Sequence, residues 1–362
     1  MKWKFYSLAF VAGMSILTAC SSDDNNDNDG NGGNGNGNEI ENGTILKGTI
    51  TSDVTLAAGN TYKLSGEYIV EEGATLHIEE GVKIIAVYDD IADYILVKQG
   101  GKINAVGTPD KPIVMTSEKE EPGAWGGIHI CGRAHTNAEG GKGSSEIGGA
   151  VYGGNDDADN SGTLQYIRLE YTGFAFDEEH EANGISFYSV GTGPIVDHCQ
   201  AYKGSDDGFE FFGGSVNVSN LVAVSCSDDS FDWTEGWNGK GTNLVAYQEA
   251  ESTLGYDCDC LMECDNNGSN NAATPVAHPV LKNLILVGNG GSKQGIRLRA
   301  GTEVEIDNAK VCGKGQPLTV ETALTENALK NGTSKLTNIT LTSELSTFHT
   351  SNWLLFGEMY LK

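Results

Sequence analysis

Hydrophobic residues in this chain come in short runs that mostly alternate with polar residues and are separated by glycine-rich turns. In the first third of the chain, the segments 75–78, 82–84, 94–97 and 113–115 follow this rhythm. Alternation with a period of two is typical of a β-strand that has one buried and one exposed face. The pattern therefore predicts an all-β fold of many short strands joined by tight turns.

One motif recurs at a shift of 22 residues and organises the rest of the chain. The sequence SDDGFEF at 205–211 returns as SDDSFDW at 227–233, and an asparagine-led apolar run follows each copy. A repeat of this length with strands but no helices is typical of a parallel β-helix, in which each coil is one repeat. Crossovers between parallel strands are right-handed. We therefore expect residues 44–342 to form a right-handed parallel β-helix.

Stacked coils place equivalent residues about 4.8 Å apart, so the repeat predicts columns of similar side chains. One column is an asparagine ladder at a turn, because asparagine tolerates left-handed backbone and its amide can bond the next amide. Two further columns alternate with polar positions and are expected to fill the interior, although Phe211 and Trp233 would alternatively offer a platform for sugar rings. The ladder is Asn220, Asn243, Asn283, Asn308 and Asn338; the interior columns are Ile185, Phe209, Phe231, Met262 and Ile296, and Phe187, Phe211, Trp233, Cys264 and Leu298.

Uneven spacing of the columns locates insertions in the coils. The excess residues fall at 134–162, 248–257 and 265–278, which we expect to protrude as loops and to build a functional face. Residues 320–330, followed by Gly332, predict a short helix, and residues 351–362 are expected to cap the open end of the stack.

The N-terminus carries an export signal. Lys2 and Lys4 precede an apolar run at 5–17 that is too short to span a bilayer, and the sequence LTAC follows, ending at Cys20. This is a lipobox, so residues 1–19 are predicted to be a lipoprotein signal peptide. Cys20 is predicted to carry acyl chains that anchor the protein to the outer membrane. Residues 20–43, rich in Ser, Asn, Asp and Gly, predict a flexible tether, and residues 44–362 a single β-helix domain with its cap.

The charge balance excludes one class of partner. Lys and Arg number 23 against 50 Asp and Glu, which gives a formal net charge of −27. Nucleic acid is excluded, because binding phosphates requires a basic surface. Polyanionic glycans are disfavoured for the same reason.

The outward positions between the two interior columns carry candidate chemistry. Glu210, Asp232 and Glu263 lie on consecutive coils, and a separation of about 4.8 Å is near that of the two carboxylates of a retaining glycosidase. They are the candidate catalytic residues. His129, Arg297 and the nearby Arg299 are the candidate ligand-binding residues, and the two arginines are the only clustered candidates for the base of a polysaccharide lyase.

A second acidic column favours calcium. Asp206, Asp228 and Asp259 are expected to stack in a turn, where like charges are costly unless a cation lies between them. The segment 157–162 contains Asp157 and Asp159 in a partial calcium-loop pattern. We therefore expect Ca²⁺ as a cofactor at one of these sites, with solvated turn aspartates as the alternative.

Seven cysteines remain after Cys20, an odd number for an oxidising compartment. Cys226 is expected to lie about one coil from Cys258 or Cys260, which makes a disulfide between coils plausible. Cys264 falls in an interior column and is expected to be a buried thiol. The pairing among the others stays open: Cys131, Cys199 and Cys312.

Several motifs carry a resemblance. WGGI at 125–128 with Gly132-Arg133-Ala134, YGGNDD at 152–157, and the segments 228–237 and 265–275 resemble a family of secreted or lipid-anchored right-handed β-helix proteins. Asp23 and Asp24, just after the lipobox, are similar to the export signal of surface lipoproteins in the Bacteroidetes group. The aspartate doublets are also similar to those of polygalacturonase-type hydrolases, but no Gly-His-Gly motif accompanies them. The resemblance implies a fold and a surface address, and no established reaction.

Three functions follow from these observations. The first is a surface-exposed outer-membrane lipoprotein that binds an extracellular ligand, above all a neutral or amine-bearing glycan, in support of an outer-membrane transporter. The second is a glycoside hydrolase, or with less support a polysaccharide lyase. The third is a structural or adhesive spacer, which would show no saturable binding of a small ligand.

Overall fold

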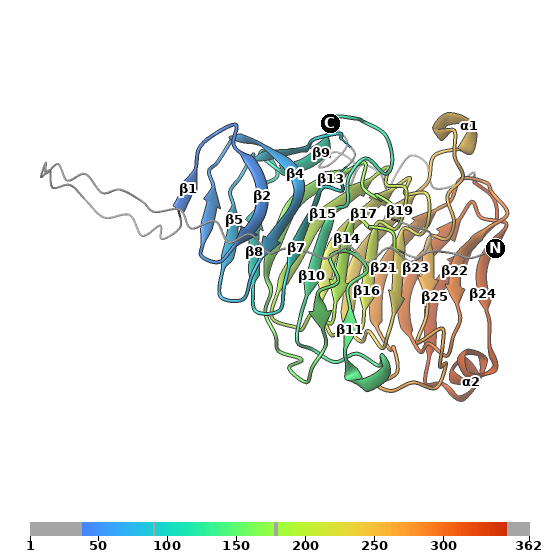
Figure 1. The fold of residues 1–362 in the computed structure, drawn as a ribbon. Coiled ribbons are helices and arrows are strands. Elements are labelled where there is room, and N and C mark those ends of the chain that lie inside the picture. The colour runs from blue at the N-terminus through green and yellow to red at the C-terminus, as the bar shows by residue number, and fades with distance from the viewer. Residues whose placement is uncertain (1–37, 90, 177–179, 346–362) are drawn as a thin grey trace, which may run out of the picture. The chain divides into compact units, whose positions relative to one another are not determined.

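The computed structural model describes residues 38–89, 91–176 and 180–345, which form a right-handed parallel β-helix and confirm the predicted fold (Figure 1). The coils run in chain order from β1 at one end to β25 at the other. The strands are β1 (Asn38–Ile40), β2 (Ile45–Ile50), β3 (Val54–Leu56), β4 (Thr61–Val70), β5 (Thr75–Ile78), β6 (Lys83–Ala86), β7 (Tyr94–Val97), β8 (Lys102–Val106), β9 (Ile113–Ser117), β10 (Ile128–Cys131), β11 (Gly143–Ser144), β12 (Val151–Tyr152), β13 (Gly162–Glu170), β14 (Ile185–Tyr188), β15 (Ile195–Tyr202), β16 (Phe209–Phe212), β17 (Val218–Val224), β18 (Phe231–Thr234), β19 (Lys240–Tyr247), β20 (Met262–Cys264), β21 (Val280–Val287), β22 (Gln294–Leu298), β23 (Glu305–Cys312), β24 (Gln316–Val320) and β25 (Lys335–Leu341).

One face of the β-helix positions the site described below. Its strands pair in parallel, each with the strand of the next coil, and we call it the cleft face. From β13 onward, each coil also has one long strand that runs across the other faces of the β-helix. These long strands pair in parallel from coil to coil, and each bends at one corner residue. The strands of the cleft face are β7, β10, β14, β16, β18, β20, β22 and β24.

The corner of the long strands is the predicted asparagine ladder. Asn220, Asn243 and Asn283 have φ values of 53°, 59° and 59°, a left-handed conformation that asparagine adopts more readily than most residues. The amide Nδ2 of Asn243 donates to Oδ1 of Asn220 at 2.8 Å, and Asn283 donates to Asn243 at 3.0 Å. Asn308 continues the ladder, whereas Asn338 donates to Asp307. The sequence therefore predicted both the register and the corner.

The interior columns form an aromatic core. Phe209 pairs in register with Phe231 on the next coil, and their rings stack with centroids 5.5 Å apart. Phe211 and Trp233 are 2% and 0% exposed, so the alternative of a sugar-stacking platform is wrong for these two residues. Stacked rings bury large apolar areas between coils and fix the spacing of the strands that carry the site.

The predicted insertions protrude from the coils. Residues 134–161 contain a short turn of 3-10 helix and the two-stranded hairpin β11–β12, and the 248–257 loop contains α1 (Glu251–Leu254). A third loop joins β20 to β21. The predicted C-terminal helix is α2 (Ala323–Asn331), which Gly332 ends in left-handed conformation with a φ of 82°.

Of the predicted tether, the structure describes only residues 38–43. Asn38–Ile40, which the sequence assigned to the tether at 20–43, form β1 and pair in parallel with β3. The signal peptide, Cys20 and the cap at 351–362 lie outside the described residues, and they stay predictions. Within the described ranges, no helix is long and apolar enough to cross a membrane.

The expected disulfide between coils is not present. The seven cysteines of the described chain are all free and buried, Cys264 among them as predicted. Burial raises the pKa of the Cys226 and Cys258 thiols to about 12, so very little of the reactive thiolate exists at neutral pH.

Candidate functional site

A row of acidic side chains crosses the cleft face. Glu210 pairs in register with Asp232, and Asp232 with Glu263. Each lies between two buried residues of its strand, so the three side chains point outward from the β-helix. The structure thus brings together the three carboxylates that the sequence placed on consecutive coils. Arg297 follows Glu263 in the same register.

A second acidic row lies in the turn that precedes each of these strands, and it comes from the repeated SDD motif. Asp207 Oδ1 accepts a hydrogen bond from the backbone N–H of Asp229 at 2.8 Å. One coil further, Asp229 Oδ1 accepts from the N–H of Cys260 at 2.6 Å. Each second aspartate of the motif therefore ties its turn to the next coil. The first aspartates of the turn, Asp206, Asp228 and Asp259, form the column that the sequence predicted as a metal site.

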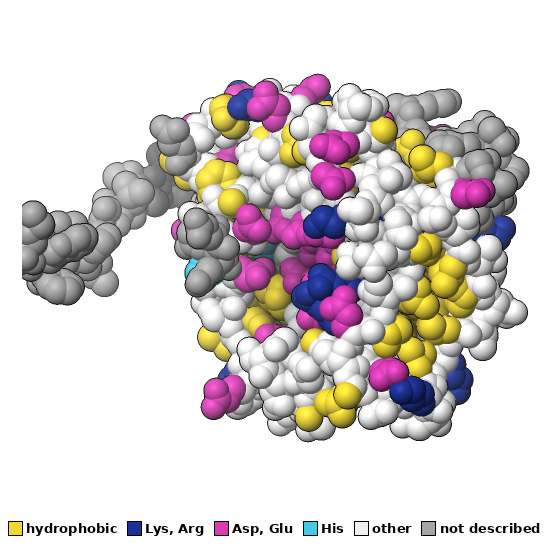
Figure 2. Space-filling view, turned by 90° about the vertical axis from the view of Figure 1, so that its right-hand side faces the viewer, with side chains coloured by type: hydrophobic (Ala, Val, Ile, Leu, Met, Phe, Trp, Pro, Cys, Tyr) yellow, Lys and Arg dark blue, Asp and Glu magenta, His cyan; other side chains and the backbone are white. Residues whose placement is uncertain are grey.

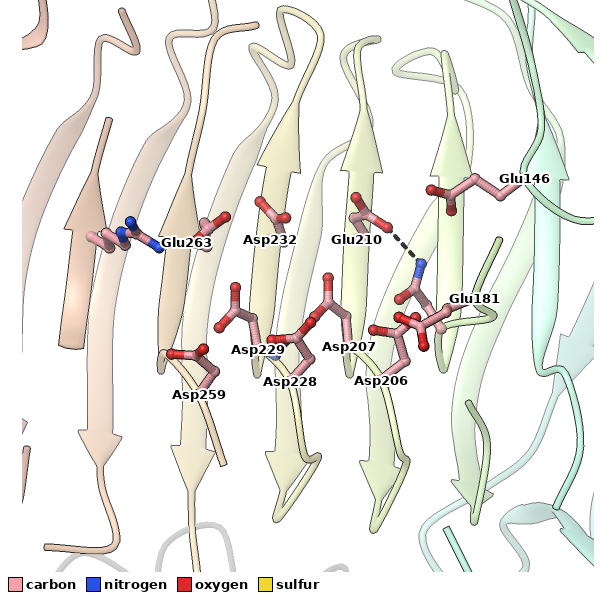
Figure 3. Close-up of a pocket in the computed structure, with 12 residues that line it drawn as sticks. Glu146, Glu181, Asp206, Asp207, Glu210, Asp228, Asp229, Asp232, Asp259 and Glu263 are labelled. Carbon is pink, nitrogen blue, oxygen red and sulfur yellow. Dashed lines mark hydrogen bonds and ion pairs between the residues drawn. The ribbon is translucent and has the colours of Figure 1, made fainter. Parts of the chain in front are cut away.

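The two rows lie side by side and both line one cleft of about 320 Å³ (Figure 3). Two loop residues, Glu146 from the 134–161 insertion and Glu181, close one end of it, and Arg297 lines the other. In the space-filling view, acidic side chains gather in a hollow beside basic ones (Figure 2). The acidic residues that line the cleft are Glu146, Glu181, Asp206, Asp207, Glu210, Asp228, Asp229, Asp232, Asp259 and Glu263.

The carboxylates form two equivalent clusters related by one coil. Oxygen atoms of Asp207, Glu210 and Asp232 lie within 4.8 Å of one another. The same is true of Asp229, Asp232 and Glu263, which are their counterparts on the next coil. Asp232 belongs to both clusters and lies between them. Two further groups with this spacing are Asp206, Asp207 and Asp228, and Asp229, Asp259 and Cys260.

The environment of these groups disfavours their ionised form. Burial is the largest cause, and the charges of neighbouring carboxylates add to it. The pKa of Asp206 rises to about 8 and that of Glu146 to about 7. Four deeply buried carboxyl groups have a pKa well above the ordinary value: Asp207, Glu210, Asp229 and Asp232.

Asp232 has an unsatisfied oxygen. Its Oδ1 is buried and has no hydrogen-bond partner among the residues that the structure describes. By contrast, Glu210 accepts a hydrogen bond from Nδ2 of Asn183 at 2.5 Å, which is drawn in Figure 3. A buried polar atom without a partner costs about 1 to 3 kcal/mol, so this oxygen marks a position where a ligand would stabilise the protein.

The two arginines close the row by ion pairing. Arg297 contacts Glu263 at 2.9 Å and Glu321 at 3.0 Å. Arg299 pairs with the same Glu263 and, at 2.8 Å, with Asp265. Carboxylates hold the pKa of both guanidinium groups above the ordinary value. Neither arginine is therefore suited to act as a base, although Arg297 does line the cleft.

His129, a predicted ligand-binding residue, lies outside the cleft. Its side chain is completely buried. Its ring stacks on that of Tyr188 and contacts the ring of Tyr94 edge to face. Burial lowers its pKa to about 4, so the ring is neutral at physiological pH. The prediction fails because the 134–161 insertion covers this outward position with a second apolar cluster that includes Ile147 and Tyr152.

The other proposed calcium ligands are also elsewhere. Asp157 contacts Nδ1 of His135 at 2.7 Å, and Asp159 accepts a hydrogen bond from Ser161 at 3.3 Å. Neither belongs to a cluster of metal-ligating groups within the described chain. The calcium-loop pattern at 157–162 therefore forms ordinary turn contacts.

Sequence reasoning missed the two loop acids of the cleft. Glu146 accepts a hydrogen bond from the Tyr188 hydroxyl at 3.2 Å, and its carboxyl group is thereby directed to the cleft. Glu146 lies in an insertion without periodicity, and Glu181 in the loop before β14, so no register could place them. The only available signal was that a long insertion precedes the acidic coils.

Comparison with known families adds one match. Residues 48–355 match the family model described as a pectate-lyase like beta helix domain. Neither a curated protein nor a solved structure matches the chain.

Proposed function

We propose, because the chain belongs to the pectate-lyase-like β-helix family, that it is a carbohydrate-binding protein whose acidic cleft holds calcium. The β-helix of this family fits a carbohydrate-related role. The cation and the ligand follow from the cleft itself. The observation that carries the proposal is the pair of carboxylate clusters joined by Asp232, whose buried Oδ1 lacks a partner.

The donor set fits calcium. Ca²⁺ takes six to eight oxygen ligands at about 2.3 to 2.6 Å, and carboxylates are its usual protein ligands. Asp207, Glu210 and Asp232 would hold one ion, and Asp229, Asp232 and Glu263 a second one a coil away. A divalent cation would remove the repulsion that otherwise keeps these groups protonated. It would also give the Asp232 oxygen a partner.

The same geometry leaves room for a sugar. Each cluster offers three side chains, which do not fill the coordination sphere of calcium even when a carboxylate binds through both oxygens. Hydroxyl groups of a glycan would complete it from the open side of the cleft. A net charge of −27 repels anionic polymers, so a neutral or amine-bearing glycan is the favoured ligand.

We place this activity at the cell surface because of the predicted lipobox. Acyl chains on Cys20, which the lipobox predicts, would hold the protein on the outer membrane, and the acidic residues after Cys20 resemble the export signal of surface lipoproteins in the Bacteroidetes group. A glycan bound there would be available to an outer-membrane transporter, which is the candidate partner.

A glycan array tests the proposal. The full chain, with Cys20→Ala to prevent lipid attachment, is applied in calcium and in EDTA. We expect binding of at least one neutral or amine-bearing glycan in calcium, and markedly weaker binding of that glycan both in EDTA and in Asp232→Asn. The matched control is Asp110→Asn, which makes the same chemical change on an exposed turn. Absence of any glycan binding in calcium would overturn the proposal, and is the outcome expected of a spacer.

A glycoside hydrolase is the second candidate, and one observation favours it. Oxygen atoms of Glu210 and Asp232 lie within 4.8 Å, near the separation of about 5 to 5.5 Å in retaining enzymes. Their raised pKa would keep one of them protonated as the general acid. Release of reducing ends from a polymer, abolished by Glu210→Gln and by Asp232→Asn alike, would support this role. A polysaccharide lyase is less favoured, because Arg297 and Arg299 are both paired.

A further inference from the structure

A second groove opens beside the acidic cleft. It has a volume of about 680 Å³, within the range of small-ligand pockets. We call it the amide groove. Three segments line it: Asn137, Ala138 and Glu139 from the first insertion, Thr234 and Glu235 at the end of β18, and residues 267–270 from the loop after β20.

The walls of the amide groove are tied together. Asn137 Nδ2 donates to Asn266 Oδ1 at 2.8 Å and to the carbonyl of Pro275 at 3.0 Å. In return, Asn267 Nδ2 donates to Asn137 Oδ1 at 3.0 Å. Two loops that lie far apart in the sequence are therefore held by one amide cluster. A preformed groove of this kind loses little conformational entropy when it binds a ligand.

Glu235 lines the groove directly after the end of β18. It has a φ of 52°, an uncommon left-handed conformation for a glutamate, and such conformations gather at functional sites. Its Oε2 accepts hydrogen bonds from Thr136 Oγ1 at 2.7 Å and from the Tyr152 hydroxyl at 2.9 Å. The second oxygen, Oε1, has no partner within the described residues. It is thus a fixed acceptor for a hydroxyl donor of a ligand.

The lining selects the chemical class of that ligand. Its described residues include no lysine or arginine, so nothing there would pair with a carboxylate, sulfate or phosphate group. They offer amides, hydroxyls and the carboxyl groups of Glu139 and Glu235 instead. Amide and carboxyl groups in a fixed arrangement recognise hydroxyl groups that both donate and accept. From these observations we infer that the amide groove binds an uncharged sugar residue by hydrogen bonding, without a cation.

The groove continues the acidic cleft along one strand. Asp232 and Thr234 both point outward from β18, and two residues of a strand span about 7 Å. One oligosaccharide can therefore reach the cation through one residue and the amide groove through another. This inference deepens the proposed function and rests on it for the carbohydrate class of the ligand.

Isothermal titration in EDTA separates the groove from the calcium cleft. The probes are neutral oligosaccharides built from glucose, mannose, galactose or xylose, and the protein is the full chain with Cys20→Ala. We expect at least one probe to bind saturably without calcium. Glu235→Gln and Asn270→Ala should each weaken it about tenfold, the worth of one good hydrogen bond, whereas Asp232→Asn should leave it unchanged. Asn270 is exposed, so its substitution keeps the test valid if Glu235→Gln does not fold.

Two results would overturn the inference. One is that no neutral oligosaccharide binds in EDTA, and the other is that both groove variants bind as tightly as the unsubstituted protein. If a glycan binds only with calcium, and binding fails in Asp232→Asn but not in Glu235→Gln, the proposed function survives and the groove does not. Binding in EDTA that calcium does not strengthen would support a sugar site in the amide groove and contradict the proposed calcium site.

Discussion

Replacing Asp232 by asparagine should have opposite effects on stability without and with calcium. The substitution keeps the shape of the side chain and removes a charge that faces four other carboxyl groups in two clusters. Without a cation, the charge is a liability, because these groups repel one another in a buried site. With calcium, the same carboxyl group is the ligand that both clusters share. A single change therefore stabilises one state and weakens the other.

The size of the first effect follows from the spacing. Two charges 4.8 Å apart, the limit within which each cluster lies, repel by about 3.5 kcal/mol at an effective dielectric constant of about 20. Partial protonation relieves some of this repulsion, so a gain of about 1 to 3 kcal/mol is expected in EDTA. An unfolding entropy of about 2.1 cal/mol/K per residue over about 300 residues converts this into a rise in Tm of about 2 to 5 °C.

Thermal unfolding of the full chain, with Cys20→Ala, in EDTA and in calcium is the assay. Calcium at a hundred times its Kd should stabilise the protein with Asp232 by about 2.7 kcal/mol, or about 4 °C, for each ion bound, and Asp232→Asn by less than about 1 °C. In both buffers, Asp110→Asn should have the same Tm as the protein that keeps Asp110 and Asp232. A lower Tm for Asp232→Asn in EDTA, or an undiminished shift by calcium, would refute the reasoning.

Three more predictions concern pH, the ladder and the anchor. Asp206 and Glu146 have a pKa of about 8 and about 7 in the folded protein, above their unfolded values, so the folded state binds more protons than the unfolded state. In EDTA the Tm should therefore fall as the pH rises from 5 to 8, and calcium should make this fall smaller. A Tm that rises over this range would contradict the raised pKa values. Asn243→Ala should lower the free energy of unfolding in urea by about 2 kcal/mol, because alanine is strained in the left-handed conformation and the amide hydrogen bonds are lost. Asn243→Gly should lower it by less, because glycine adopts this conformation without strain. Equal losses in the two variants would argue against a backbone role for Asn243. Cys20→Ala should move the protein from the membrane fraction to the soluble fraction and abolish labelling by a palmitate analogue, and unchanged fractionation would argue against a lipid anchor.

The fold could be predicted in detail because a β-helix is a repeat. Once the SDD motifs at 205–211 and 227–233 fixed the period, strand pairing followed without knowledge of distant contacts. The ladder at Asn220 and Asn243 and the outward row from Glu210 to Glu263 are direct consequences of that period. Each coil contacts its neighbours along the stack, so local spacing determines the register.

The site was less accessible because part of it comes from loops. The sequence identified the acidic rows but not that both line one cleft, since the path of the chain from Asp229 into β18 sets this geometry. Glu146 and the cover over His129 both belong to the 134–161 insertion, where no period exists. Residues outside the repeat could therefore be assigned to a loop, but not to a position in space.

Direct measurement of calcium binding tests the central claim most simply. Isothermal titration of calcium into the metal-free full chain at neutral pH should show saturable binding with a Kd at or below about 10⁻³ M, the range of extracellular calcium modules. The same titration should show release of protons, because the buried carboxyl groups must ionise when the cation binds. Absence of saturable heat up to that concentration, or binding that Asp232→Asn leaves intact, would contradict the assignment of the cleft.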